Sequence, residues 1–139
     1  MENKREGVIL VVDDDRNAVE ILYRMLQKEG FEVLRAYGGP QALEIAAAQA
    51  VDVILLDVMM PRMDGFQVCA ALRAEVRTRD IPVILLTAKD DMETRVSGMK
   101  LGVSEFLTKP VNKVDLFSRV RAQIHQRTLE QHIDAILPD

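Results

Sequence analysis

Short, continuous runs of valine, isoleucine and leucine recur along this chain, and each run leads into a polar residue. The runs occupy residues 8–12, 53–56 and 83–86, and a fourth segment at 105–108 resembles them. Runs of this length, separated by segments with helical spacing of apolar residues, predict buried strands of a parallel sheet. Since parallel strands need crossover connections, the alternation predicts one doubly wound α/β domain.

The residues that follow these runs carry acid, hydroxyl and amine groups. Asp13 and Asp14 follow the first run, and Asp57 follows the second. Thr87 follows the third run, and Lys109 follows the fourth. The carboxyl ends of parallel strands share one edge of the sheet, where ligands bind in folds of this class. We therefore expect these five residues to form a single site.

Three carboxylates that share one crevice need a positive partner. Two like unit charges 4 Å apart repel by about 4 kcal/mol at an effective dielectric constant of 20. A site of oxygen ligands from Asp13, Asp14 and Asp57 favours Mg²⁺ or Mn²⁺. Lys109 and Thr87 complete a cradle for a small tetrahedral anion such as a phosphoryl group. Asp57 is then the expected nucleophile, and its product is an acyl phosphate.

The composition is that of a single soluble domain. The 139 residues are 48% hydrophobic and 29% charged, with a net charge of −4. The absence of a basic stripe predicts no direct nucleic-acid binding, and no apolar stretch has the length of a membrane span. A single cysteine, Cys69, cannot form an internal disulfide, and the charged N-terminus does not resemble a signal peptide. These features predict a cytoplasmic location.

The motifs VVDDD, VILLDVMMPRMDG, VILLTA and EFLTKP, in this order and spacing, resemble the receiver domain of bacterial two-component response regulators. The resemblance covers about residues 8–127. It implies a flavodoxin-like (βα)5 fold with a five-stranded parallel sheet in the order 2-1-3-4-5. It also implies a phosphorylation-dependent switch and not a dedicated enzyme, because receivers catalyse only their own phosphorylation and dephosphorylation.

The resemblance gives each acidic residue a role. Asp57 would accept a phosphoryl group from a sensor histidine kinase or a phosphotransfer protein. Asp14 would bind Mg²⁺ directly, together with Asp57 and the backbone carbonyl of Met59, and Asp13 would act largely through bound water. Met59 and Lys89 occupy positions that tune the dephosphorylation rate in the family. The bulk of Met59 and the charge of Lys89 predict slow hydrolysis.

The same resemblance describes the switch. Lys109 would pair with the phosphoryl oxygens, and its bond to Pro110 would be cis. Thr87 would move to hydrogen-bond the phosphoryl group while Phe106 turns inward. The surface of the fourth helix, fifth strand and fifth helix would then change its partners. Phe106 can provide the packing part of this switch, but it lacks the hydroxyl of the tyrosine that many receivers carry.

Two other functions compete with this interpretation. A haloacid-dehalogenase-type phosphohydrolase also uses a strand-end aspartate, but it requires a second aspartate two residues later, where this chain has Met59. A degenerate receiver that signals without phosphate would typically lack one of the site residues. Asp15 is expected to cap the first helix, and Cys69 is expected to be a small core residue.

The last predicted helix is longer than packing on a sheet requires. We assign residues 1–127 to the receiver and residues 128–139 to an extension that serves as a linker or interaction segment. The chain would then either signal to an attached output domain or dock to a target protein, and a homodimer through the last helices is a hypothesis. The helix sequence resembles receivers joined to cyclic-dinucleotide enzymes more than those of winged-helix regulators. His125 and His132 could bind a metal across a dimer, but exposed side chains are the simpler expectation.

Overall fold

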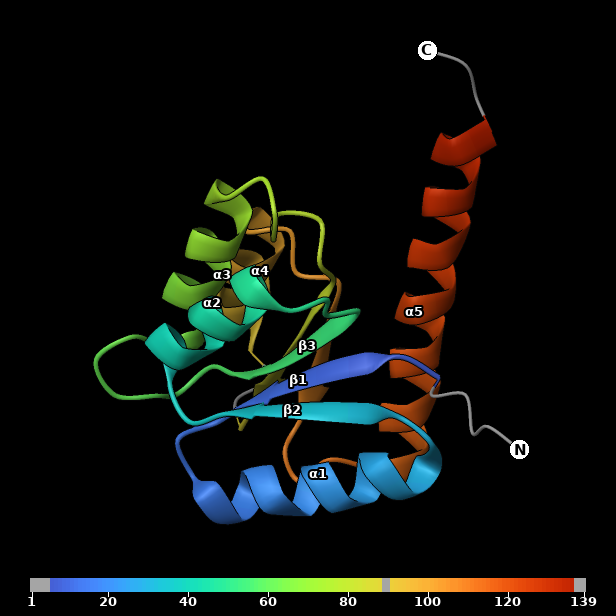
Figure 1. Cartoon of the computed structure of the whole chain (residues 1–139). Helices are drawn as coiled ribbons and strands as arrows, with labels where there is room; N and C mark the ends of the chain where they lie inside the picture. The colour runs from blue at the N-terminus through green and yellow to red at the C-terminus, as the bar shows by residue number, and fades with distance from the viewer. Residues whose placement is uncertain (1–5, 89–90, 137–139) are drawn as a thin grey trace.

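The computed structural model describes residues 6–88 and 91–136. Within these residues, strands and helices alternate from β1 to α5 (Figure 1). The strands are β1 (Val8–Val12), β2 (Glu32–Ala36), β3 (Val53–Asp57), β4 (Val83–Thr87) and β5 (Glu105–Thr108). The helices are α1 (Arg16–Glu29), α2 (Gly39–Ala48), α3 (Gly65–Ala74), α4 (Met92–Lys100) and α5 (Lys113–Ile136).

The five strands form one parallel sheet in the order β2-β1-β3-β4-β5, which confirms the predicted fold and strand order. β1, β3 and β4 are central, and their continuous apolar runs match strands that are covered on both faces. β2 lies at one edge and exposes Glu32 and Arg35. The reversal of strand order between β1 and β3 places a ligand-binding crevice at their carboxyl ends.

Each face of the sheet carries its own apolar core, because successive side chains of a strand point to opposite faces. In β1, Leu10 packs with residues of α2 and α3, and Ile9 packs with residues of α1 and α5. Figure 1 shows α2, α3 and α4 on one side of the sheet and α1 and α5 on the other. Cys69 is fully buried in the first of these cores, as predicted.

Local signals in the sequence set the helix ends. The Asp15 carboxylate accepts hydrogen bonds from the backbone N–H groups of Asn17 and Ala18, which confirms it as the N-cap of α1. Gly30 ends α1 in a left-handed conformation with φ of 113°, which glycine adopts without steric cost. Asp91 caps α4, and its carboxylate accepts a hydrogen bond of 2.8 Å from the Thr94 N–H group.

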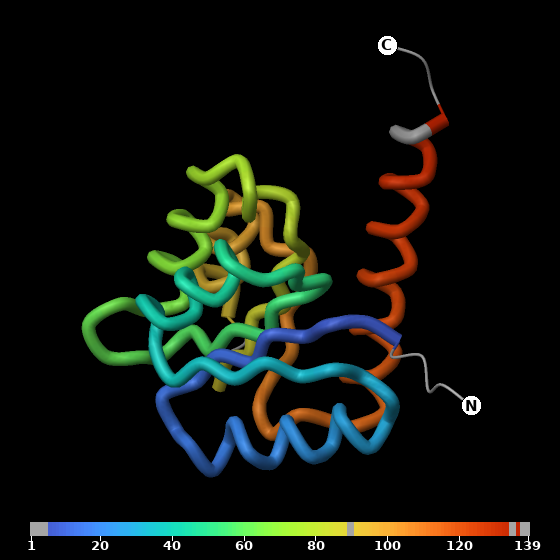
Figure 2. Tube along the Cα trace, viewed as in Figure 1, coloured from blue at the N-terminus to red at the C-terminus, as the bar shows by residue number. Residues whose placement is uncertain are grey.

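α5 begins after Asn112, whose side chain accepts a hydrogen bond from the Asp115 N–H group. Its first half packs on the sheet. Its second half continues beyond the rest of the described chain (Figure 2). The side chains of Leu129, Ile133 and Ile136 in this half are exposed. The division at residues 127 and 128 stays a prediction, because the helix is continuous there. Among the described residues, no helix combines the length and the apolar character needed to cross a membrane.

Candidate functional site

Four of the strands deliver the five predicted residues to one edge of the sheet. Asp57 and Thr87 are the last residues of β3 and β4. Asp13 follows β1, and Lys109 follows β5. Val12 pairs with Leu56 in the sheet, so the residues that follow them, Asp13 and Asp57, emerge side by side.

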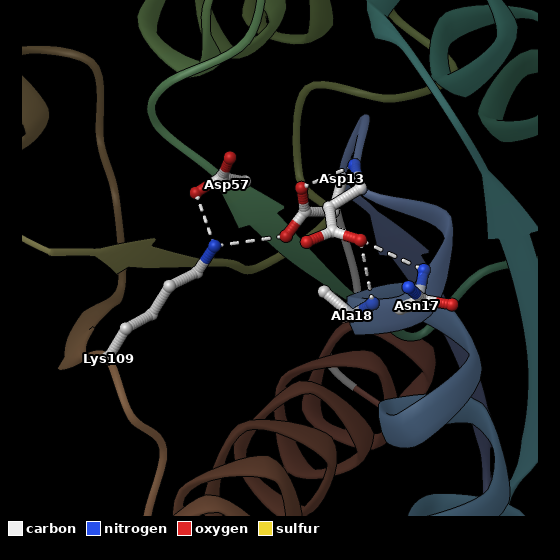
Figure 3. Close-up of polar contacts among 6 residues, drawn as sticks. Asp13, Asn17, Ala18, Asp57 and Lys109 are labelled. Atoms are coloured by element: carbon white, nitrogen blue, oxygen red, sulfur yellow. Dashed lines mark hydrogen bonds and ion pairs between the residues drawn. The ribbon is translucent and has the colours of Figure 1, made fainter.

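Lys109 links the two buried acids. Its Nζ lies 3.0 Å from Oδ2 of Asp13 and 2.9 Å from Oδ1 of Asp57, and Figure 3 shows the amine between the two carboxylates. Asp13 is only 2% exposed and Asp57 only 5% exposed, whereas Lys109 is about one third exposed. Because both acids are buried, removing the Lys109 amine would be strongly destabilising. It would leave two buried carboxylates without their cationic partner.

Asp14 adds a third carboxylate to the same crevice. One oxygen of each of Asp13, Asp14 and Asp57 lies within 4.8 Å of the others. Asp14 is exposed, so a cation can reach the cluster from solvent. Lys109 supplies one positive charge against three negative charges, and three carboxylates are the hard oxygen ligands that Mg²⁺ binds. The donor set therefore fits the predicted divalent cation.

Burial and charge act in opposite directions on the pKa values of the site. Burial raises the pKa of Asp57 above its ordinary value, Lys109 opposes this shift through its hydrogen bond, and the neighbouring Asp13 adds to it. Burial alone would lower the pKa of Lys109, but its hydrogen bonds with Asp57 and Asp13 outweigh this effect and raise the pKa. Lys109 is therefore held as a cation, and Asp57 is a more basic carboxylate than an exposed aspartate.

Thr87 lies at the end of β4 and is 3% exposed. Its backbone carbonyl accepts a hydrogen bond of 2.8 Å from the Lys109 N–H group, so the ends of β4 and β5 are joined at the site. The bond between Lys109 and Pro110 is cis, as the family resemblance implies.

Phe106, in β5, lies on the face of the sheet that α4 covers. Its ring is half-buried and packs against the core between α3 and α4. α4 approaches this ring closely at Gly98, where an added Cβ atom would lie 2.6 Å from Cζ of Phe106. Arg95 stacks over the same ring, with its Cζ 5.3 Å from the ring centroid. Gly98 was not among the residues predicted from the sequence, although a glycine inside a helix is a signal of close packing.

The loop after β3 exposes Met59 to solvent. It also brings the start of α3 close to the backbone of Asp57. The Met59 side chain is 69% exposed. The Gly65 N–H group donates to the Val58 carbonyl at 2.9 Å, and an added Cβ atom on Gly65 would lie 2.6 Å from the backbone oxygen of Asp57. Only glycine allows this approach of α3 to the backbone of Asp57.

The remaining candidates lie away from this crevice or outside the described residues. Asp15 caps α1, and His125 and His132 are exposed on α5. Lys89, the second residue predicted to tune the dephosphorylation rate, lies outside the described residues. The site therefore contains Asp13, Asp14, Asp57, Thr87 and Lys109, with Met59 at its rim.

Comparison with known proteins identifies the family. A model of the response regulator receiver domain matches residues 9–121. This chain belongs to the response regulator receiver domain family. It is 52% identical over 114 residues to the response regulator PleD of Caulobacter vibrioides, a match that covers 82% of this chain and 25% of PleD. It is 43% identical over 122 residues to the response regulator MprA of Mycobacterium ulcerans, which covers 88% of this chain and 52% of MprA.

Solved structures of receivers share the fold. The Vibrio cholerae chemotaxis protein CheY4 is 32% identical with a TM-score of 0.80, covering 84% of this chain and 97% of that one. The receiver domain of the Francisella response regulator 1452 is 31% identical with a TM-score of 0.81, covering 87% and 98%. The chain thus spans nearly all of these solved receivers, but only a quarter of PleD and half of MprA. It is a signalling domain of the two-component type.

Proposed function

We propose that this receiver accepts a phosphoryl group on Asp57 from the phosphohistidine of a histidine kinase or phosphotransfer protein. The observation that carries the proposal is the Lys109 amine, which bridges Asp57 and Asp13 at 2.9 and 3.0 Å. Asp57 is the acid that ends its own strand, so it can face an incoming ligand while Asp13 and Asp14 occupy the neighbouring strand end.

The transfer exchanges one bond to phosphorus for another. An Asp57 oxygen attacks phosphorus, the P–O bond of the acyl phosphate forms, and the P–N bond to the donor imidazole breaks. Lys109 stays a cation and pairs with the charge on the phosphoryl oxygens. Thr87, at the end of the neighbouring strand, supplies a hydroxyl that can donate to one of these oxygens.

Asp13, Asp14, Asp57 and the backbone carbonyl of Met59 would hold Mg²⁺ or Mn²⁺, since three carboxylates lie within 4.8 Å of one another. When bound, the cation neutralises charge on the phosphoryl oxygens during the transfer. Asp13 and Asp14 thus serve the reaction as ligands, and Asp57 is both a ligand and the nucleophile.

The phosphoryl group then changes the surface of the domain. It adds about −1.5 to −2 charge and three strong acceptor oxygens at the site. These oxygens draw in Thr87 and Lys109, and the space near Thr87 becomes available to Phe106. The surface formed by α4, β5 and α5 carries the change to an output domain or target protein. The exposed apolar residues of the α5 extension also offer a surface to an output domain or to a second copy of the chain.

Intact mass spectrometry tests the proposal directly. The chain is incubated with Mg²⁺ and acetyl phosphate, and wild type is compared with Asp57→Asn. We expect one added phosphoryl group on wild type, none on the variant, and no reaction after Mg²⁺ is chelated. Failure of wild type to gain the group from either acetyl phosphate or a phosphorylated histidine kinase would contradict the proposal. It would favour a receiver that signals without phosphate.

Following the same masses over time tests the role of Met59. We propose that its bulky, apolar side chain hinders the attack of water on the acyl phosphate. Met59→Asn offers polar groups that can orient water, so we expect the phosphorylated variant to lose its group about tenfold faster. A half-life equal to or longer than that of wild type would contradict this role.

A further inference from the structure

α4 is held by few buried side chains. Of its nine residues, all of which the structure describes, Gly98 alone is buried. The large apolar side chains of Met92, Val96 and Met99 are exposed. A helix with so little buried apolar surface belongs to the parts of a protein that open most easily.

The C-terminal end of α4 is fixed by one arginine from α3. Arg73 Nε donates to the Leu101 carbonyl at 3.1 Å, and its Nη2 donates to the Gly102 carbonyl at 3.0 Å. Its Nη1 donates to the carbonyls of Arg79 and Ile81, both at 2.9 Å. A single guanidinium therefore joins the end of α4 to the connector that leads into β4.

This contact depends on the shape of arginine. A guanidinium has five N–H donors in a fixed plane, and here four hydrogen bonds reach backbone carbonyls of two separate segments. The Cys69 thiol adds a donor to the same Leu101 carbonyl at 3.5 Å. Gly102 takes a φ of 72° beside Arg73, where an added Cβ atom would lie 3.3 Å from Nε.

The two ends of α4 face different parts of the molecule. Its N-terminal end, capped by Asp91, follows β4 along the chain, and β4 ends at Thr87 of the phosphoacceptor site. Its C-terminal half contacts Phe106 at Gly98 and leads directly to the carbonyls that Arg73 binds. The hydrogen bonds of Arg73 thus tie the C-terminal end of α4 to α3.

We propose that Arg73 is the pivot of α4. Given the proposed phosphorylation of Asp57, on which this inference rests, the N-terminal turn of α4 moves while its C-terminal end stays fixed to α3. Because a short helix is stiff, a displacement of the N-terminal end of α4 tilts the whole helix about its C-terminal end, which Arg73 holds. Arg73 is thus a positioning residue that directs the signal to the exposed face near Met92 and Val96.

Residue-resolved amide hydrogen exchange of the whole chain tests the pivot. It is measured by NMR with and without Mg²⁺ and beryllium trifluoride, an acyl-phosphate mimic, and with Asp57→Asn as the unresponsive control. We expect exchange at the Thr94 and Arg95 amides to change about fivefold or more, and exchange at the Leu101, Gly102 and Val103 amides to change less than about twofold. Equal changes at both ends of wild-type α4 would overturn the proposal.

Arg73→Met separates a pivot from simple stabilisation, and Arg73→Lys is the matched control that keeps the charge. We expect Arg73→Met to spread the response to residues 101–103, and Arg73→Lys to restore part of the wild-type difference between the two ends. Arg73→Met could instead exchange its amides faster throughout, while beryllium trifluoride still changes exchange only in the N-terminal turn of α4. That result would contradict a pivot. Intact mass after acetyl phosphate treatment distinguishes the two proposals: an unphosphorylated wild type overturns both, whereas a phosphorylated wild type with a uniform α4 response overturns the pivot alone.

Discussion

α1 and α4 both begin just after a strand that carries site residues, yet they are held in the fold in opposite ways. α1 has fourteen residues and buries Val19, Leu22 and Leu26 against the sheet. α4 has nine residues and buries only Gly98. Burial of a leucine or valine side chain contributes about 1.5–3 kcal/mol, so α1 is stabilised by packing to an extent that α4 cannot match.

This difference between α1 and α4 matches their roles in the proposed mechanism, which are cation binding and response to phosphorylation. The acids that follow β1 must keep their positions to hold a cation, and α1 is packed firmly beside them. The segment that follows β4 must respond to a new group at Asp57, and α4 buries far less of its own apolar surface than α1 does. In the proposed mechanism, α1 is the fixed side of the site and α4 is the movable side.

Truncating one apolar side chain in each helix should show the largest contrast. We expect Leu26→Ala to lower the free energy of unfolding by about 2–5 kcal/mol, because Leu26 is fully buried. Met99→Ala, at a side chain that is 69% exposed, should change it by no more than about 0.5 kcal/mol. Urea unfolding followed by circular dichroism measures both values. Similar losses for the two variants would mean that α4 belongs to the cooperative core.

Removing the two N-cap aspartates should give a smaller contrast. We expect Asp15→Ala to cost about 1 kcal/mol in the free energy of unfolding, because α1 unfolds only with the whole domain. Asp91→Ala should change the global value by less than half of this cost. It should instead speed exchange of the Thr94 amide, which donates to the Asp91 carboxylate at 2.8 Å. A global loss from Asp91→Ala as large as that from Asp15→Ala would contradict a loosely held α4.

Much of this architecture could be predicted from local sequence patterns. The runs that begin at Val8, Val53 and Val83 are apolar throughout because both faces of the central strands are covered. Their polar ends then had to meet, since parallel strands share one carboxyl edge. Asp15 could also be predicted as a helix cap, because capping depends on residues close in sequence.

Other contacts join segments that no local pattern connects. Arg73 reads as an ordinary exposed residue near the end of a helix, and its partners are backbone carbonyls of the segments around Arg79, Ile81 and Leu101. Backbone carbonyls are present at every position, so sequence carries no sign of which of them an arginine will bind. The fit of Gly98 to the Phe106 ring was hidden for a similar reason, because it requires the packed positions of α4 and β5.

The two edges of the sheet have a consequence for how these molecules behave at high concentration. β2 presents charged side chains at Glu32 and Arg35, and β5 has only four residues, with Glu105 engaged by Arg119 of α5. Charged or very short edge strands discourage pairing with strands of other molecules. The protein can therefore carry a sheet whose central strands are almost wholly apolar and still resist the edge-to-edge association that leads to aggregates.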